Sequence, residues 1–351
     1  MKGKQKILVI LTPGFPASES DTTCLPMHQD LVRAVQRLDP SLQIFVLSFQ
    51  YPYHKKIYSL FNATIISYGG RNKGGMPRLF LRTQIKATLN ELRAKHEIIG
   101  LFSFWCGECA LVGKRFGDRH NIPHYCWVLG QDARENNPYP GRLDFQPEEL
   151  IALSDFLQSE FEKNHHIRPL TVIPPGVDHS RMVGGNMAQD IDLLAVGSLI
   201  PLKQYSIFLK IVAALRKDFP GLKAVLAGDG PEREDLKQQI GLYGLEKNVS
   251  LAGELPYNDV LRLMQRAKIF LHPSSYEGFS GVCLEALSAG AQVISFCQPM
   301  NYQIKNWQIA RSPGQMTTMA KELLQEPLMG FEAEQGFTIE KTAKEILNLF
   351  I

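Results

Sequence analysis

Short apolar runs alternate with amphipathic stretches of helical length along the first half of the chain. Seven of these runs have the length of buried strands: 7–11, 44–49, 64–67, 98–104, 124–129, 150–153 and 171–173. Continuous apolar runs of this length, separated by helix-length segments, are typical of parallel sheets covered by helices. The pattern therefore predicts an α/β fold built on a parallel sheet.

The pattern loosens after residue 178 and then restarts with a second set of runs: 193–196, 224–227, 249–251, 269–271 and 293–296. A chain of 351 residues is long enough for two domains. We expect two doubly wound domains, over 1–180 and 181–335, with ligands at the carboxyl ends of their strands. The remaining stretch, 336–351, carries an amphipathic helix with Ala343, Ile346 and Leu347 on one side.

Composition excludes several classes of protein. The net charge is only +3, and no arginine-rich or aromatic-interleaved tract appears, so nucleic acid is not an expected partner. The apolar run after Lys6 is too short to span a membrane, and six scattered cysteines without a secretory segment indicate a cytoplasmic location. Cys106 and Cys109 have a redox-like spacing, but no second ligand pair for zinc is suitably spaced.

The segment from Ile269 to Gly290 has the pattern of an anion site. An apolar run precedes a loop that contains Glu277, and a helix is expected from about Ser280 until Gly290. The peptide N–H groups at the helix start have no partner within the helix and lie at the positive end of its dipole. A diphosphate would fit there, with Glu277 and Glu285 reaching the sugars on its two sides.

The plain alternative is that Glu277 is a loop acid and Glu285 a helix-surface acid. Apolar residues surround Glu285, however, and a charge near buried surface usually has a partner. Glu277 lies in the motif Pro-Ser-x-Tyr-Glu-Gly-Phe, and Glu285, after seven intervening residues, begins the motif Glu-Ala-Leu-x-Ala-Gly. This signature resembles the donor site of family 4 retaining glycosyltransferases of the GT-B fold.

The resemblance implies two Rossmann-like domains that face each other across a cleft. The N-terminal domain would bind the acceptor and the C-terminal domain a nucleotide-diphosphate sugar, with the final helix crossing back to the N-terminal domain. It also implies a reaction without a metal ion or a cofactor, since the nucleotide sugar is a co-substrate. Glu277 would hold sugar hydroxyls and Glu285 the ribose.

Two further stretches resemble donor-binding motifs of the same family. Residues 196–203 resemble Gly-Arg-Leu-x-x-x-Lys, whose arginine and lysine hold the diphosphate; Lys203 matches, whereas Ser198 replaces the arginine. Residues 226–231 match a Gly-x-Gly-Pro motif, and the base is expected near residues 254 and 255. A surface lysine and turn glycines are the plain alternatives. The expected donor site comprises Gly197, Ser198, Lys203, Gly228, Glu254, Leu255, Glu277, Gly278, Phe279, Ser280, Gly281, Val282 and Glu285.

The expected acceptor residues lie at the ends of two strands in the first domain. Gly14 and Phe15 follow the first strand, where a glycine lets backbone approach a ligand or simply makes a turn. Gln131 and Asp132 follow the apolar run that ends at Leu129. Many members of the family have a histidine at the position of Leu129. Asp132 joins Lys203 and Glu277 as a catalytic candidate.

Basic residues are concentrated between residues 55 and 119, with twelve against four acidic ones. Arg78, Arg82 and Lys86 recur every fourth residue on a predicted helix, and Leu81 and Ile85 begin an apolar stripe on another face. A solvated helix face is the plain interpretation of this pattern. The functional interpretation is that this face binds an anionic membrane surface and brings the enzyme to a lipid-linked acceptor.

We therefore expect a retaining, metal-independent glycosyltransferase that moves a sugar from a nucleotide-diphosphate sugar to a hydroxyl of a glycan or lipid-linked glycan. Lys203 and the N–H groups of residues 279–282 would stabilise the leaving diphosphate. Two other classes stay open. Ser198 and Leu129 are compatible with a catalytically silent nucleotide-sugar-binding subunit, and a related GT-B nucleotide-sugar epimerase is the third possibility.

Overall fold

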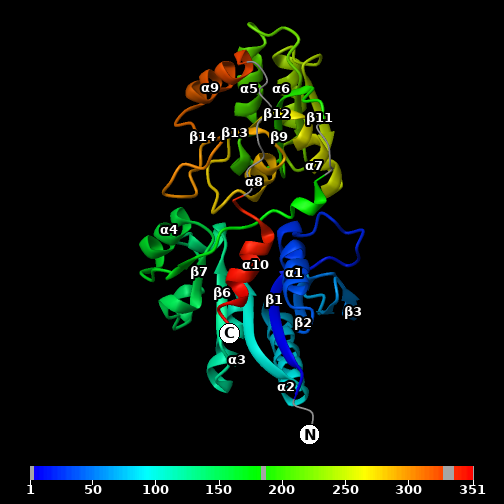
Figure 1. The fold of residues 1–351 in the computed structure, drawn as a ribbon, viewed down its shortest axis with the longest axis vertical. Coiled ribbons are helices and arrows are strands. Elements are labelled where there is room, and N and C mark those ends of the chain that lie inside the picture. The colour runs from blue at the N-terminus through cyan, green and yellow to red at the C-terminus, as the bar shows by residue number, and fades with distance from the viewer. Residues whose placement is uncertain (1–3, 183–186, 327–335, 351) are drawn as a thin grey trace. The chain divides into compact units, whose positions relative to one another are not determined.

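The computed structural model describes residues 4–182, 187–326 and 336–350 (Figure 1). The chain divides into two compact units. Unit 1 comprises Met1–Gly176 together with Ile339–Ile351, and unit 2 comprises Val177–Thr338. These limits lie within a few residues of 180 and 335, where the sequence pattern placed the domain boundaries.

Unit 1 is built on an eight-stranded sheet in the order β3-β4-β2-β1-β5-β6-β7-β8. Its strands are β1 (Lys6–Gly14), β2 (Gln43–Tyr51), β3 (Lys56–Leu60), β4 (Ala63–Ser67), β5 (Glu97–Phe104), β6 (His124–Val128), β7 (Leu150–Ala152) and β8 (Thr171–Val172). The expectation of a fully parallel sheet is wrong at one edge, because β3 pairs antiparallel with β4. The largely exposed strand β3 has no continuous apolar run, so the pattern did not reveal it.

Helices cover the sheet of unit 1. They are α1 (Pro26–Leu38), α2 (Gly75–Lys95), α3 (Glu108–His120), α4 (Asp155–His165) and α10 (Ile339–Leu347), with short 3-10 helices η1 (Gly130–Ala133), η2 (Pro140–Arg142) and η3 (Pro147–Glu149). The apolar stripe expected on α2 is confirmed, since Leu81, Ile85, Leu89 and Leu92 are its buried residues. Burying such a stripe is the main contribution to the stability of a surface helix.

The final helix belongs to unit 1, although unit 2 separates it from the rest of that unit in the sequence. Helix α10 lies against α1 in Figure 1, with Ile339, Ala343 and Ile346 buried. Arg37 and Glu340 form an ion pair at 2.6 Å across the two helices. The apolar side of the amphipathic C-terminal stretch is thus buried in the first unit.

Unit 2 contains a six-stranded, fully parallel sheet in the order β11-β10-β9-β12-β13-β14. Its strands are β9 (Ile191–Val196), β10 (Ala224–Ala227), β11 (Val249–Gly253), β12 (Ala267–His272), β13 (Gln292–Ser295) and β14 (Trp307–Ile309). Its helices are α5 (Tyr205–Leu215), α6 (Arg233–Leu242), α7 (Tyr257–Arg266), α8 (Gly281–Ser288) and α9 (Pro313–Gln325), with 3-10 helices η4 (His179–Arg181) and η5 (Pro201–Lys203). The three-residue strand β14 is too short to have been detected in the sequence.

This strand order places a topological switch point between β9 and β12. From β9 the chain continues towards β10 and β11, whereas from β12 it continues towards β13 and β14. Connections that leave neighbouring parallel strands in opposite directions open a crevice at the carboxyl ends of those strands, where doubly wound sheets bind ligands. In unit 2 the segments that follow Val196 and His272 meet at this switch point.

Among the described residues, no helix is both long enough and apolar enough to cross a membrane.

Candidate active site

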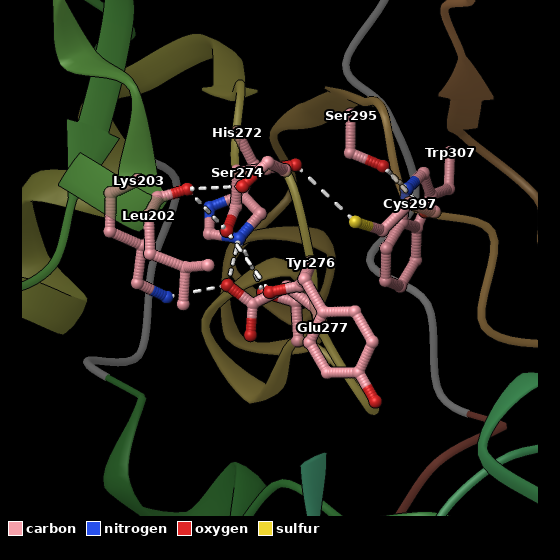
Figure 2. Close-up of polar contacts among 11 residues, drawn as sticks. Leu202, Lys203, His272, Ser274, Tyr276, Glu277, Ser295, Cys297 and Trp307 are labelled. Carbon is pink, nitrogen blue, oxygen red and sulfur yellow. Dashed lines mark hydrogen bonds and ion pairs between the residues drawn. The ribbon is translucent and has the colours of Figure 1, made fainter. Parts of the chain in front are cut away.

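The loop after β12 is attached to the turn after β9. The carbonyl oxygen of Leu202 accepts hydrogen bonds from the N–H of Ser275 at 3.0 Å and from the hydroxyls of Ser274 and Ser275 at 3.3 and 3.2 Å. Gln204 then takes up a left-handed conformation, and α5 begins. Because the two connections are joined here, Lys203 and Glu277 lie side by side although 74 residues separate them (Figure 2).

Lys203, Glu277 and His272 form a connected polar cluster at the switch point. The Nζ atom of Lys203 lies 2.5 Å from Oε1 of Glu277, and Nε2 of His272 lies 3.0 Å from the same oxygen (Figure 2). His272 is buried, and its Nε2 also lies 3.2 Å from the hydroxyl of Ser280. Both contacts are to Oε1, so Oε2 of Glu277 bonds to neither Lys203 nor His272.

His272 is a site residue that the sequence analysis missed. It occupies the last position of β12 after an apolar run, where an imidazole is unexpected unless it has a partner. A polar residue at the end of an apolar strand was the only sign of a functional role in the sequence. The partners of His272, Glu277 and Ser280, come from the following loop and helix start, which fold back beside the strand.

The cluster keeps Glu277 ionised. Burial alone would raise the pKa of Glu277, but the hydrogen bond from His272 and the charge of Lys203 outweigh it and lower the pKa to about 2. Burial lowers the pKa of His272, against the opposing influence of Glu277. Within the described residues, Nδ1 of His272 is buried without a hydrogen-bond partner, so we assign a neutral ring that donates from Nε2.

The start of α8 lies next to this cluster and has unpaired N–H groups. Within the described chain, the N–H groups of Ser280, Gly281 and Val282 donate to no other group, and no side chain caps the helix. A Cβ atom built on Gly281 would meet nothing within 4 Å, so the space beside the first turn is open. Phe279 and Ser280 have buried side chains, so only their backbone is offered to a ligand. These features fit an anion site.

Glu285 has a specific partner on the neighbouring helix. The hydroxyl of Tyr257 on α7 donates to Oε1 of half-buried Glu285 on α8 at 2.8 Å. The guanidinium of Arg181 lies 4.3 Å from the centre of the Tyr257 ring. The carboxylate is therefore held in place. Tyr257 was also missed by the sequence analysis, because nothing in its spacing links α7 to α8.

The remaining expected donor residues lie at the carboxyl ends of β9, β10 and β11. A Cβ atom on Gly228 would stand 1.9 Å from the carbonyl oxygen of Gly197, so close packing of these two turns requires glycine. Ser198 and Glu254 have exposed side chains, and Leu255 is half-buried. The structure thus gives Gly228 a packing role that needs no ligand.

The expected acceptor residues of unit 1 are mostly buried. The ring of Phe15 is fully buried and lies edge-on to Phe61 with 6.3 Å between the ring centres, so only its backbone could meet an acceptor. A Cβ atom on Gly14 would meet only ordinary contacts at 3.7 Å, and hence no close approach requires glycine there. Gln131 is exposed, and it remains a prediction.

The side chain of Asp132 holds two loops of unit 1 together, and its catalytic role stays a prediction. Its side chain is buried, and Oδ2 accepts the N–H groups of Cys106 and Leu129, both at 2.8 Å. These bonds join the loop after β5 to the loop after β6. Burial outweighs the two hydrogen bonds and raises the pKa of Asp132 to about 7.

Asp132→Asn should therefore change how stability depends on pH. A carboxyl with a raised folded-state pKa stabilises the fold at low pH, and this contribution is lost as the pH rises from about 4 to about 7. Between about pH 4 and pH 7, the free energy of unfolding of the native protein should fall by on the order of 4 kcal/mol more than that of the variant. Denaturant unfolding of both proteins at several pH values measures the difference, and parallel pH profiles would contradict it.

The basic stripe expected on α2 is not a uniform charged face. Arg82 and Arg78 both contact the carboxylate of Glu108 on α3, with Nε–Oε1 distances of 2.7 and 3.6 Å. The packing of α2 on α3 thus supplies an acid that the spacing on α2 does not reveal, and binding of an anionic membrane surface through Arg78, Arg82 and Lys86 stays a prediction. Lys86 lies one turn further along, and its side chain is exposed.

The two cysteines of the redox-like motif are free thiols in the interior of unit 1. Cys106 and Cys109 are buried, and burial raises the pKa of the Cys109 thiol. The described part of the chain contains no group of three or more side chains that could hold a metal ion.

Comparisons with known proteins agree with this geometry. Residues 180–322 match the family described as glycosyl transferases group 1. The gpi3 subunit of phosphatidylinositol N-acetylglucosaminyltransferase from Schizosaccharomyces pombe is 32% identical over 105 residues, which are 30% of this chain and 23% of that protein. Glycogen synthase from Mycobacterium tuberculosis is 27% identical over 177 residues, 49% of this chain and 43% of the enzyme. The chain thus aligns with less than half the length of these relatives.

Solved structures resemble nearly the whole chain. Sucrose-phosphate synthase from Thermosynechococcus elongatus matches with a TM-score of 0.71 at 16% identity, covering 99% of this chain and 95% of that one. The Anabaena protein HepE, solved with UDP and glucose, matches with a TM-score of 0.66 at 17% identity, covering 97% and 94%. The chain therefore has the GT-B fold, and most of its second unit matches the model of the group 1 glycosyl transferases.

Proposed function

We propose that the protein is a retaining glycosyltransferase that moves a sugar from a nucleotide-diphosphate sugar to a hydroxyl of a glycan or lipid-linked glycan, without a metal ion. The observation that carries this proposal is the cluster of Lys203, Glu277 and His272 beside the open helix start of α8, at the switch point of unit 2. It combines a cation, an ionised carboxylate and unpaired backbone donors in one crevice.

These groups match the charges that develop when a nucleotide sugar is cleaved. The sugar becomes cationic in the transition state while the departing diphosphate gains negative charge. The ammonium of Lys203 and the N–H groups at the start of α8 would stabilise that diphosphate. Since Lys203 and His272 bind Oε1 of Glu277, its Oε2 is the oxygen that would accept hydrogen bonds from sugar hydroxyls.

The comparisons support a nucleotide-sugar donor without identifying it. HepE was solved with UDP and glucose, and the relatives by sequence include an N-acetylglucosaminyltransferase subunit and a glycogen synthase.

A catalytically silent nucleotide-sugar-binding subunit is the second candidate. Ser198 stands where the resembling family has one of its two diphosphate-binding cations, and the Ser198 side chain is exposed. A nucleotide-sugar epimerase is the third. Release of nucleoside diphosphate from a panel of nucleotide sugars, measured with and without glycan acceptors, separates them. Acceptor-dependent release supports the transferase. Conversion of the nucleotide sugar to its epimer without net release, followed by chromatography, indicates the epimerase. Binding with neither release nor conversion indicates the silent subunit.

Glu285→Ala should weaken the binding of free nucleotide by about 1–3 kcal/mol, because it removes a carboxylate that would bind the ribose hydroxyls. The fold should persist, since the side chain is only half-buried. Calorimetric titration with nucleoside diphosphates measures the loss. Tyr257→Phe is the matched control, because it removes the partner of Glu285 but keeps the carboxylate. Equal affinities of the native protein and Glu285→Ala would refute the ribose role.

A further inference from the structure

A basic hollow lies on unit 1 between α2 and α3. Its volume is about 510 Å³. The lining residues are Lys86 and Asn90 from α2 and Arg115, Phe116, Arg119 and His120 from α3. Phe116 is buried and forms the apolar floor, whereas Lys86, Asn90, Arg115 and Arg119 are exposed. The hollow thus combines one apolar surface with a rim of hydrogen-bond donors.

The cations of this hollow have no counter-ion in the part of the chain that the structure describes. Lys86, Arg115 and Arg119 form no ion pair with any described residue. The acids near them in sequence do not line the hollow: Asp118 bonds to Lys114 at 2.8 Å, and Glu91 does not belong to the lining. Repulsion among unpaired like charges costs stability, so their concentration around a hollow is informative.

Helix-end electrostatics explain only part of this arrangement. Arg119 and His120 are in the last turn of α3, where cations interact favourably with the helix dipole. Lys86 lies nine residues before the end of α2, and Arg115 lies more than one turn before the end of α3. Their convergence on the same hollow comes from the packing of the two helices rather than from the ends of either helix.

The location separates the hollow from the proposed donor site. Helix α2 leads from the carboxyl end of β4 to the amino end of β5, and α3 leads from β5 to β6 in the same sense. The hollow is lined by the second halves of both helices and therefore lies towards the amino ends of the strands. The donor cluster belongs to unit 2, so the two sites share no residue.

We propose that this hollow binds a phosphate group, carried either by a soluble phosphomonoester or by a lipid headgroup. Two guanidinium groups and an ammonium match the double charge of a phosphomonoester better than the single charge of a carboxylate. The side-chain amide of Asn90 adds a donor, and Phe116 contacts the carbon part of the ligand. The proposal is independent of the reaction catalysed in unit 2.

The test compares one charge-reversed variant with a matched control. Lys86→Glu, Arg115→Glu and Arg119→Glu together remove the three cations of the hollow. Lys217→Glu, Lys237→Glu and Lys247→Glu together make the same change in net charge at exposed positions of unit 2. The soluble probes are inorganic phosphate and glycerol 3-phosphate, titrated by calorimetry. The membrane probe is sedimentation with phosphatidylcholine vesicles that contain or lack phosphatidic acid.

The native protein should bind at least one kind of probe. The hollow variant should bind that probe at least about tenfold more weakly, whereas the affinity of the control variant should stay within about twofold of the native value. Binding of the soluble probes identifies a phosphometabolite site, and binding only to phosphatidate vesicles identifies a headgroup site. A native protein that binds none of the probes would overturn the proposal, as would equal losses in hollow and control variants. If charge reversal lowers the unfolding temperature, the triple change to Gln at the same positions replaces it.

Discussion

Replacing Lys203 by alanine should lower kcat by about two orders of magnitude while changing the affinity for the donor much less. The Nζ atom of Lys203 lies at the switch point, 2.5 Å from Oε1 of Glu277, and the Lys203 side chain is only 18% exposed. A cation held there meets little screening by water, and it interacts most strongly with the diphosphate when bond cleavage increases its negative charge. Steady-state kinetics with the donor varied at saturating acceptor measure the effect.

Two further variants separate the role of Lys203 from general effects of charge. Lys210→Ala removes an exposed lysine from the neighbouring helix α5 and should leave kcat unchanged. Lys203→Arg keeps the positive charge and should recover part of the lost rate, although the guanidinium has a different shape. If Lys203→Ala instead raises KM and preserves kcat, the ammonium binds ground state and transition state equally, and the catalytic role is wrong.

The proximity of Lys203 and Glu277 illustrates what could be predicted from the sequence. Both belong to short motifs that directly follow apolar runs, and the carboxyl ends of central parallel strands lie at one edge of a sheet. The same logic located the strands other than β3 and β14, and the buried stripe of α2, because apolar periodicity reports burial directly.

Features that depend on a neighbouring element could not be predicted in this way. Phe15 follows a strand as a ligand-binding residue would, but its ring is fully buried and lies edge-on to Phe61. Arg78 and Arg82 look solvated along α2 until α3 places Glu108 beside them. His272 is a single polar residue at a strand end, and its importance appears only when Glu277 and Ser280 are positioned around Nε2.

Gly228 shows the same limit and gives the prediction with the largest effect on stability. It lies in the turn after β10 with φ of 138°, a conformation that L side chains rarely adopt. Its N–H donates to the carbonyl oxygen of Gly253 at 2.7 Å, and a Cβ atom would be 1.9 Å from the carbonyl oxygen of Gly197. Three turns at the carboxyl edge of the sheet therefore meet at a point without room for a methyl group.

Gly228→Ala should destabilise unit 2 by about 3–5 kcal/mol, because backbone strain and steric overlap add together and the obstructing atom belongs to the main chain. Hydrogen exchange measured on peptides from β9 and β10 should show the loss of protection, while peptides from unit 1 should keep theirs. Gly221→Ala is the matched control, since Gly221 is exposed and a Cβ atom there meets nothing within 4 Å. If Gly228→Ala keeps native protection and loses only nucleotide binding, Gly228 serves the ligand, as its motif suggested, and not the packing of the turns.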